Sequence, residues 1–327
     1  MPGESMICSA QQAFSEPTAC STQKVSTQKV RAMSTSGTTQ SVHSGTSKYT
    51  AVVLYYKLGP DLYKTVASLV GQTLPPARIV VVDNNSGDGI VREVCRRYPQ
   101  CEPLVLSENE GYSGGMSAGL RRVSKYGQRI LFMTHEVILA RNCVEEMTRA
   151  FEMNSQLVLA SPVLTHGVGG PVWSLGGKFG KFGTVQHITS VDDLDTLEWL
   201  DGACLFAEMN AFTTIGGFDH DYFLYWEDVD ISVRLHEVGE ISCVATAMAS
   251  QGTSMAPTYF KLRNQVMFWR KQQNTVNVVK TIAAAVAKIL LRDLRHMNIQ
   301  AVRVRLLALC HGFTGNMSVK YNHVRVS

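Results

Sequence analysis

The chain has 327 residues, of which 45% are apolar, and it carries a formal net charge of +4. This composition allows a globular protein with a substantial core, in one large domain or two average ones. It excludes a zinc finger, because the eight cysteines form no Cys-x-x-Cys pair and no histidines cluster at finger-like spacing. We therefore expect a reduced, cytoplasmic protein.

The charge is spread unevenly along the chain. Residues 259–327 hold twelve Lys or Arg residues and one acid, Asp293, a balance of +11 that leaves about −7 for the preceding residues. Such asymmetry predicts an anionic partner for the C-terminal region, or a solvated helix face. Nothing in this region resembles a nucleic-acid reading module, so we expect no nucleic-acid partner.

Residues 1–48 are rich in Ser, Thr and Gln and show no sustained apolar period, which predicts a disordered tail. They lack the basic start and the continuous apolar core of a signal peptide. The longest apolar stretch near the C-terminus, Val278 to Leu291, is interrupted by Lys280 and Lys288. We expect no membrane span, while peripheral membrane contact and a homo-oligomer stay open.

Strand and helix patterns alternate after the tail. An apolar run at 51–56 predicts a buried strand that begins near Tyr49, and residues 62–70 follow with helical spacing. The later elements are a strand at 79–82, a helix at 90–98, and strands at 102–106 and 130–133. This alternation predicts an α/β fold with a doubly wound, mostly parallel sheet, whose ligands bind beyond the carboxyl ends of the strands. Asp83 and the segments 108–115 and 134–136 fall at that edge.

Two features at this edge have both a functional and a structural explanation. The glycines of segment 108–119 stand where a strand gives way to a helix, so backbone amides can approach a phosphate or ribose, or form a structural turn. Asp83 ends a buried strand, where its carboxylate can accept the imide N–H of a uracil or thymine base. Capping of the next helix by the Asn-Asn-Ser that follows is the alternative.

The most informative segment runs from Gly216 to Leu235. It places Glu227, Asp228 and Asp230 within four positions, next to aromatic residues. Acids at a helix N-terminus are stabilised by the helix dipole, which is the structural explanation. The apolar residues that follow fit a strand by alternation and a helix by i, i+4 pairs, so both elements stay open.

Three motifs in this order resemble one family. They are Asp83-Asn-Asn-Ser-Gly-Asp-Gly, then Asn109-Glu-Gly-Tyr-Ser-Gly-Gly, then Gly217-Phe-Asp through Tyr225-Trp-Glu-Asp-Val-Asp-Ile-x-x-Arg. The set resembles the inverting family 2 glycosyltransferases of GT-A fold, in their rhamnosyltransferase-like branch, and covers roughly Tyr49 to Met317. We expect a nucleotide-sugar-binding and catalytic domain at 49–258 and a basic helical C-terminal extension at 259–327.

The resemblance implies a one-step displacement, in which a carboxylate base deprotonates the acceptor hydroxyl while the diphosphate leaves from the opposite face of the sugar. The family motif puts this role on Asp228, with Glu227 beside it to raise its basicity or hold the acceptor. The resemblance also implies a UDP or dTDP sugar as the donor. The residues expected to contact it are Tyr55, Asp83, Asn85, Asn109, Gly111, Gly114, His135, Glu136, Trp199 and Asp201.

The chain departs from the family pattern at the metal. Family members usually carry Asp-x-Asp after the fourth strand to hold a divalent ion, but this chain has Thr134-His135-Glu136. Where a metal-binding His is common, it reads Ser-Gln-Gly-Thr-Ser at 250–254. Glu136 alone can offer one oxygen to Mg²⁺ or Mn²⁺, and a protonated His135 can hydrogen-bond a phosphate. We predict a weak, donor-dependent metal requirement or none.

Other functions stay open at this point. The degraded metal motif suits a catalytically impaired family member that binds a sugar nucleotide or serves as a partner subunit, whereas the intact Glu227-Asp228 pair favours an enzyme. A nucleotidyltransferase would need a Gly loop rich in Lys or Arg at the first strand, which is lacking. The unusual site without an export signal suggests a specialised pathway such as secondary metabolism.

Overall fold

The computed structural model describes residues 49–57, 59–252 and 258–315. The predicted tail at 1–48 lies outside the described residues, as do residues 253–257, which include the last two of the Ser-Gln-Gly-Thr-Ser segment, and residues 316–327 of the basic extension. The first strand, β1 (Tyr49–Tyr55), is buried along its whole length. Its side chains alternate between two apolar layers, with Val53 in one and Val52 in the other, so it is the centre of a covered sheet.

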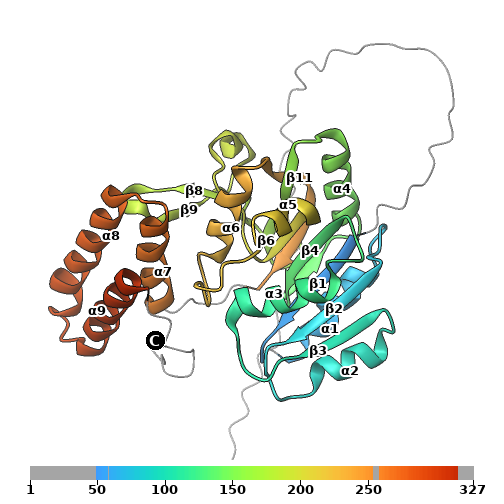
Figure 1. Ribbon diagram of the computed structural model, residues 1–327, viewed down its shortest axis with the longest axis horizontal. Coiled ribbons are helices and arrows are strands. Elements are labelled where there is room, and N and C mark those ends of the chain that lie inside the picture. The colour runs from blue at the N-terminus through green and yellow to red at the C-terminus, as the bar shows by residue number, and fades with distance from the viewer. Residues whose placement is uncertain (1–48, 58, 253–257, 316–327) are drawn as a thin grey trace, which may run out of the picture. The chain divides into compact units, whose positions relative to one another are not determined.

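Four parallel strands make the first half of a nine-stranded sheet. They stand in the order β3 (Cys101–Val105), β2 (Arg78–Asp83), β1 and β4 (Arg129–Thr134). The crossovers contain α1 (Asp61–Val70), α2 (Ile90–Arg97) and α3 (Gly111–Val123). The predicted α/β fold is confirmed here, and the carboxyl ends of these strands meet at one edge (Figure 1).

The second half of the sheet is mixed. β10 (Cys204–Glu208) runs antiparallel between β4 and β6 (Leu157–His166), whereas β11 (Glu240–Gln251) runs parallel to β6. The short strands β5 (Val137–Leu139) and β7 (Val172–Ser174) pair antiparallel with β11 and β6. The expected parallel arrangement therefore holds for the first four strands, and the insertion of β10 changes it beyond them.

A ribbon and two turns lie in the chain between β7 and β10. The ribbon consists of β8 (Gly177–Phe179) and β9 (Val185–His187), joined through the turn η1 (Lys181–Gly183). A second turn, η2 (Val191–Thr196), follows it. This segment carries no sequence motif, yet it brings His187 to the cavity described below.

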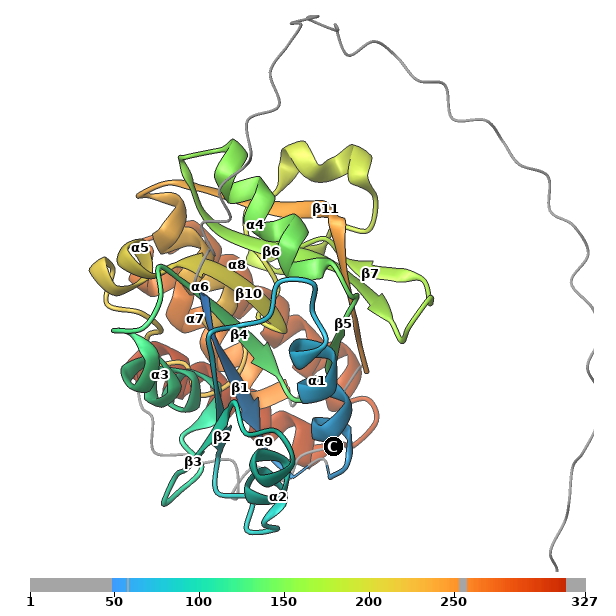
Figure 2. The ribbon, with the colours of Figure 1, turned by 90° about the vertical axis from the view of Figure 1, so that its right-hand side faces the viewer.

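Helices cover both faces of the sheet, with α1 and α3 on opposite sides of β1 (Figure 2). On one face, α1, α2 and α4 (Cys143–Met153) bury side chains such as Val66, Val94 and Met147. On the other face, α3, α5 (Met209–Thr214) and α6 (Glu227–His236) bury side chains such as Met116, Phe212 and Ile231. The two layers fix α6 and its acidic first turn against the sheet.

The predicted helical extension is also confirmed. It comprises α7 (Thr258–Lys271), α8 (Thr275–Lys288), the π-helical turn η3 (Ile289–Asp293) and α9 (Ile299–Thr314). One side of α7 packs on α8 and α9 through Leu262, Ala285 and Ala308. On its other side, Phe268 and Trp269 pack with Trp199 and Trp226. No helix within the described ranges is long and apolar enough to cross a bilayer.

Candidate active site

A cavity of about 490 Å³ lies beyond the carboxyl end of β4. Five residues predicted from the sequence line it together: Glu136, Trp199, Asp201, Glu227 and Asp228. They come from three separate segments, which follow β4, precede β10 and open α6. The cavity is thus built from loops at one sheet edge, where ligands of open α/β sheets bind.

Asp228 is held at a fixed position in the first turn of α6. Its Oδ2 accepts a hydrogen bond from the backbone N–H of Gly202 at 3.1 Å, and its Oδ1 accepts one from that of Val229 at 2.8 Å. The segment that could have been a strand or a helix is therefore a helix, and its N-terminal dipole favours the charged carboxylate.

The loop at 199–203 is tied to the same helix. Ser232, one turn into α6, accepts a hydrogen bond from this loop at 3.0 Å and donates one to the carbonyl of Asp228 at 2.6 Å. The hydroxyl of Tyr112 donates to the carbonyl of Gly202 at 2.5 Å. A Cβ atom on Gly202 would lie 3.0 Å from the Cβ of Asp228, so the glycine permits this close approach.

Three of the four acids on the cavity wall, Asp201, Glu227 and Asp228, have raised pKa values. Burial and the neighbouring Asp201 raise the pKa of Asp228 to about 6, against the opposing effect of its two backbone donors and His187. Burial raises the pKa of Asp201 to about 6 as well. Burial and the charge of Asp228 raise the pKa of Glu227 well above its ordinary value. Asp228 is therefore mostly charged at pH 7, whereas Glu227 beside it has a stronger tendency to hold a proton than an ordinary glutamate.

Glu136 reaches the cavity beside an amide. Its Oε1 accepts a hydrogen bond from Nε2 of Gln251 at 2.7 Å, while the Oε1 of Gln251 is buried without a hydrogen-bond partner among the described residues. Asp201 is close enough for its pKa to be raised by Glu136. Carboxylate and amide oxygens are ligands that Mg²⁺ and Mn²⁺ accept.

These residues fit a divalent ion held largely by substrate. Within the described ranges, no group of three or more His, Cys, Asp or Glu side chains is arranged to hold a metal ion. The unpaired amide oxygen of Gln251 and the carboxylate of Glu136 supply two oxygen donors, and Mg²⁺ commonly completes its shell with water and phosphate oxygens.

His135 lies beneath the cavity rather than on its wall. Its Nδ1 donates to the carbonyl of Leu54 at 3.0 Å, and its Nε2 lies 3.6 Å from Oε2 of Glu136. Burial lowers the pKa of His135, so the ring is neutral at pH 7. The ring packs edge-on against Tyr55.

Tyr55 and Asp83 end adjacent strands and organise the loops that follow. The hydroxyl of Tyr55 donates to Oδ2 of Asp88 at 2.5 Å and accepts the N–H of Gly59 at 3.1 Å. The Oδ1 of Asp83 accepts the N–H of Ser86 at 2.7 Å. Both residues lie outside the cavity lining, at the same sheet edge.

Asn84 joins the first two sequence motifs, a role that the sequence did not single out. Its Nδ2 donates to Oδ1 of Asn109 and to the carbonyl of Gly111, at 2.9 Å each, and its Oδ1 accepts the N–H of Glu110. The predicted Asn85 is exposed in a left-handed conformation with φ 63°. Asn109 also accepts the N–H of Gly111 at 2.9 Å and so shapes the start of α3.

The two predicted donor-site glycines are required by packing. Gly111 has φ 72°, and a Cβ atom there would lie 2.1 Å from the carbonyl oxygen of Phe223. A Cβ atom on Gly114 would lie 2.5 Å from the Cβ of Glu110. Neither glycine lines the cavity. Gly111 therefore allows the start of α3 to pack closely against the loop that precedes α6.

The residues that line the cavity without having been predicted as site residues include His187, Lys261 and Gln265. Burial lowers the pKa of His187, against the opposing charge of Asp228. Lys261 and Gln265 lie one turn apart on α7, for which the sequence pattern predicted a packed helix with some basic residues near the acceptor or at a subunit contact. A basic side chain thus reaches the same cavity as the acids.

A strained turn precedes α6. Tyr225 and Trp226 both have left-handed backbone conformations, with φ 69° and 74°, which costs free energy in residues other than glycine. Asn264 of α7 holds this turn, since its Nδ2 donates to the carbonyls of Leu224 and Tyr225 at 2.9 and 2.7 Å. Trp226 packs against Phe268 of the same helix.

The chain is similar in sequence to known glycosyltransferases. Residues 50–206 match the model of the family described as glycosyl transferase family 2. A curated relative, N-acetylglucosaminyl-diphospho-decaprenol L-rhamnosyltransferase of Mycobacterium tuberculosis, is 26% identical over 221 residues, which cover 58% of this chain and 71% of the relative.

Solved glycosyltransferases share the fold at lower identity. The structure of GalNAc-T7 with UDP, GalNAc and Mn²⁺ superposes with a TM-score of 0.58 and 15% identity, over 68% of this chain and 47% of that one. The chain thus spans about half the length of that protein. The mannosyltransferase PcManGT of Pyrobaculum calidifontis, in complex with GDP-Man and Mn²⁺, superposes with a TM-score of 0.54 and 13% identity, over 81% and 87% of the chains.

The motifs, the GT-A fold and the family match agree with one another. Residues 50–206 therefore form a glycosyl transferase family 2 domain, and the chain is similar to a curated rhamnosyltransferase.

Proposed function

We propose that this glycosyltransferase moves a sugar from a UDP or dTDP sugar to an acceptor hydroxyl with inversion at the anomeric carbon, and that Asp228 is the base. The observation that carries the proposal is Asp228 itself, a cavity carboxylate held by two backbone N–H groups. A pKa of about 6 leaves it charged at pH 7 yet more basic than an ordinary aspartate.

The neighbouring Glu227 supports a division of roles between the two acids. Its raised pKa favours the protonated form, and its Oε2 has no hydrogen-bond partner among the described residues. A neutral carboxyl group can both donate and accept, so Glu227 is suited to hold the acceptor hydroxyl while Asp228 takes its proton. A subunit that only bound sugar nucleotides would have no use for this buried pair.

The donor is proposed to lie along the sheet edge. Asp83 would accept the imide N–H of the base near Tyr55, while Trp199 and Asp201 would face the sugar. Asn85, Asn109, Gly111, Gly114 and His135 would act through the shape of the loops rather than by direct contact, because their described contacts are with protein atoms or solvent.

The nucleobase contact has its own test. Asp83→Ala should weaken donor binding by about 1.5–3 kcal/mol, the contribution of a charged hydrogen bond, while turnover at saturating donor changes little. Isothermal titration with UDP and dTDP measures this loss. Glu93→Ala is a suitable control, since it removes an exposed carboxylate on α2 rather than one at the strand ends near Tyr55. An unchanged donor affinity in Asp83→Ala would mean that Asp83 only shapes the turn to Ser86.

A divalent ion, when bound, would neutralise charge on the leaving diphosphate. We propose that Glu136 and Gln251 would hold such an ion weakly, in line with their oxygen donors on the cavity wall. Lys261, on the same wall, supplies a fixed positive charge that reduces the demand for the ion.

The direct test is a panel of nucleotide sugars. Incubation of the full chain with UDP- and dTDP-linked hexoses should give slow hydrolysis of one donor, and an acceptor screen should then give transfer. Proton NMR of the product identifies the anomeric configuration. Retention of configuration would reject direct displacement, and the absence of turnover with every donor would favour a non-catalytic binding subunit.

A further inference from the structure

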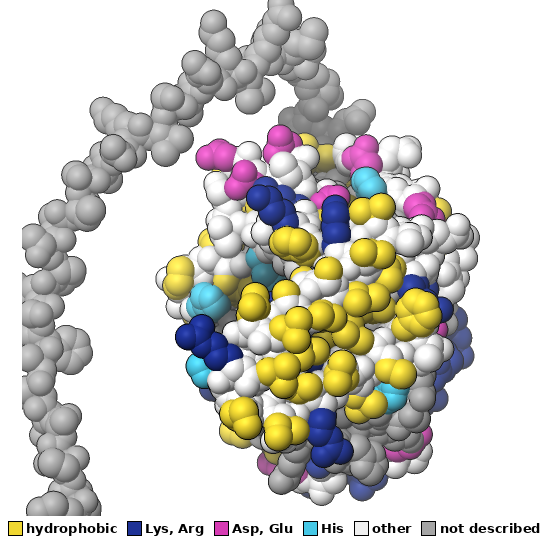
Figure 3. Space-filling model, turned by 90° about the vertical axis from the view of Figure 1, so that its left-hand side faces the viewer, with side chains coloured by type: hydrophobic (Ala, Val, Ile, Leu, Met, Phe, Trp, Pro, Cys, Tyr) yellow, Lys and Arg dark blue, Asp and Glu magenta, His cyan; other side chains and the backbone are white. Residues whose placement is uncertain are grey.

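The C-terminal helices expose an unusual amount of apolar surface. Of the twenty large apolar side chains that are exposed in the described residues, eleven lie between Val276 and Phe313. They belong to α8, η3, α9 and the turn before α9: Val276, Val279, Val286, Leu290, Leu291, Leu294, Met297, Ile299, Leu306, Leu307 and Phe313. Figure 3 shows apolar side chains gathered on this side of the molecule. Contiguous apolar patches on a protein surface mark sites of association.

Helix α8 is apolar on two sides, one buried and one exposed. Val278, Thr281 and Ala285 are buried against the neighbouring helices. Val279 and Val286, together with Leu290, recur on another side of the helix and stay exposed. A helix that is apolar on two sides needs a second partner for the outer side.

The chemistry of the partner follows from the charges around these residues. Lys280, Lys288, Arg292, Arg295 and Arg303 are exposed on the same elements. The only acid in residues 259–327, Asp293, is buried and paired with Arg305 at 2.7 Å. We call these five cations, with the eleven apolar residues, the basic apolar face. It has no exposed acid, so its partner must bring negative charge together with apolar surface.

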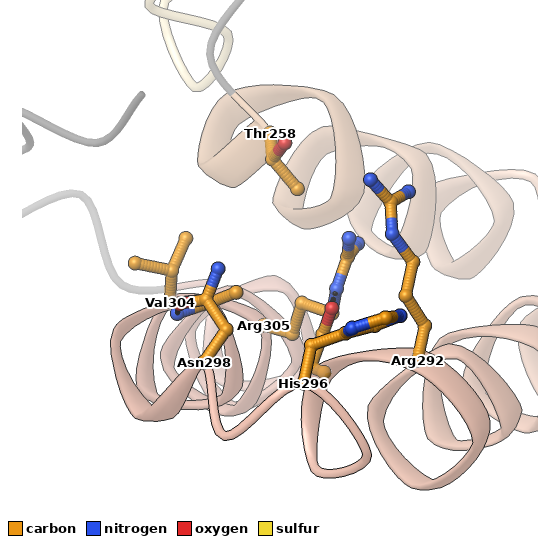
Figure 4. Close-up of a pocket in the computed structure, with 8 residues that line it drawn as sticks. Thr258, Arg292, His296, Asn298, Val304 and Arg305 are labelled. Atoms are coloured by element: carbon orange, nitrogen blue, oxygen red, sulfur yellow. Dashed lines mark hydrogen bonds and ion pairs between the residues drawn. The ribbon is translucent and has the colours of Figure 1, made fainter.

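A pocket of about 360 Å³ adjoins this face, between the start of α7 and the turn into α9. Figure 4 shows Arg292, His296 and Arg305 around it, below Thr258. Arg305 is held by the buried Asp293, which leaves Arg292 and His296 as exposed donors. A guanidinium group beside further N–H donors is a phosphate-binding arrangement.

A second copy of the chain suits this face poorly. In a two-fold dimer the same patch meets itself, so the exposed cations of each copy would face those of the other without an acid to pair with. A bilayer with anionic lipids offers both missing partners, because its headgroups carry the negative charge and its acyl region accepts Val, Leu and Ile side chains.

We propose that the basic apolar face binds the surface of a membrane that contains anionic lipid, with a headgroup phosphate in the pocket lined by Arg292, His296 and Arg305. The helices lie on the bilayer rather than across it. Because α7 packs on α9 and also lines the cavity through Lys261, the catalytic part of the chain stands beside the lipid surface.

Cosedimentation of the full chain with vesicles tests this inference. We expect binding to vesicles of equal parts phosphatidylcholine and phosphatidylglycerol, and little binding to phosphatidylcholine alone. Arg292→Glu with Arg295→Glu should lower the affinity by about tenfold or more, since each cation near an anionic surface contributes about fivefold. Leu290→Ser with Leu291→Ser should lower binding at high salt as well, where screening leaves the apolar contribution.

Matched controls distinguish binding by the basic apolar face from non-specific adsorption to vesicles and from misfolding of the variants. Met153→Ser with Val168→Ser changes two apolar residues that are just as exposed elsewhere, and Arg92→Glu with Lys125→Glu reverses two charges elsewhere. Both should bind vesicles as the unchanged chain does, and circular dichroism should show every variant folded. Equal binding of the face variants would overturn the proposal. The proposal would also be overturned if the unchanged chain bound no vesicles and formed a dimer in light scattering that Leu290→Ser with Leu291→Ser dissociates.

Discussion

Asp228 shows how a single side chain acquires chemical character from its surroundings. Burial and Asp201 raise its pKa, whereas the N–H groups of Gly202 and Val229 keep part of the preference for the charged form. The balance, at about 6, is near the optimum for a base that works at neutral pH. The rate for limiting donor should therefore fall below about pH 6 as Asp228 takes up a proton.

Asp228→Asn tests this role directly. Turnover should fall by roughly 10² to 10⁴ with little change in donor affinity, and the acidic limb of the pH profile should disappear. The same change should raise the melting temperature at pH 7. The pKa of Asp228 is higher in the folded chain than in the unfolded chain, so the folded state binds the proton more tightly. The stability that this proton binding contributes is present at low pH and is lost as the pH rises through about 6, so at pH 7 the native chain carries an unfavourable buried charge that the Asp228→Asn variant would not have. Near-normal turnover in Asp228→Asn would remove it from the mechanism.

The prediction of a weak requirement for a divalent ion can be tested at Glu136. EDTA should lower turnover in part, and added Mg²⁺ or Mn²⁺ should restore it at concentrations that depend on the donor, because few protein ligands are available. Glu136→Gln should raise the ion concentration needed for half-maximal turnover and leave the rate without ion unchanged. Elemental analysis after dialysis is the second measurement, and a tightly held ion that survives chelation would contradict the prediction.

At the scale of elements, α7 supports the turn at Tyr225–Trp226. Asn264→Ala would release both carbonyls that Asn264 binds, and the strained turn should relax away from its left-handed conformation. We expect the rate constant for transfer to fall by about ten- to a hundredfold, since small displacements of a base are costly. Donor binding at Asp83 should be unaffected.

Arg270→Ala is the matched control for Asn264→Ala. It removes a hydrogen bond from α7 to the carbonyl of Gly312 in α9 and does not touch the turn. Both variants should unfold at lower temperature, but only Asn264→Ala should lose turnover at a temperature where both are folded. Equal losses in the two variants would mean that α7 acts only through stability.

Elements with a strong local signal could be predicted from the sequence. Continuous apolar runs predicted β1, β2 and β4, and the acidic motif predicted Asp228 as a site residue although the sequence left its secondary structure open. His187 escaped prediction because it lies in a short ribbon with no motif or period, and only the tertiary fold brings it to the cavity. The insertion of β10 between β4 and β6 also depends on long-range pairing that no local pattern encodes.

At the scale of the whole molecule, the basic extension and the catalytic part share one apolar cluster. Met267, Phe268 and Trp269 of α7 pack with Trp199, Tyr222, Trp226 and Val229. A chain that ends before Thr258 would expose these aromatic residues, and we expect it to be largely insoluble and inactive. Expression beside a chain that ends at Gly315, which keeps every described helix, provides the comparison. A soluble and fully active chain without α7 would show that the extension is dispensable.

The clamp by Asn264 also has a consequence for the order of events during synthesis. Asp228 and the loops around it are all translated before α7, yet the turn that precedes Asp228 is held by Asn264, a side chain made later. A nascent chain that has released only the sheet and α6 from the ribosome therefore lacks the clamp. We therefore expect a chain that ends before α7 to lack the proposed transfer activity, because the turn before α6 would have no side chain of α7 to hold it.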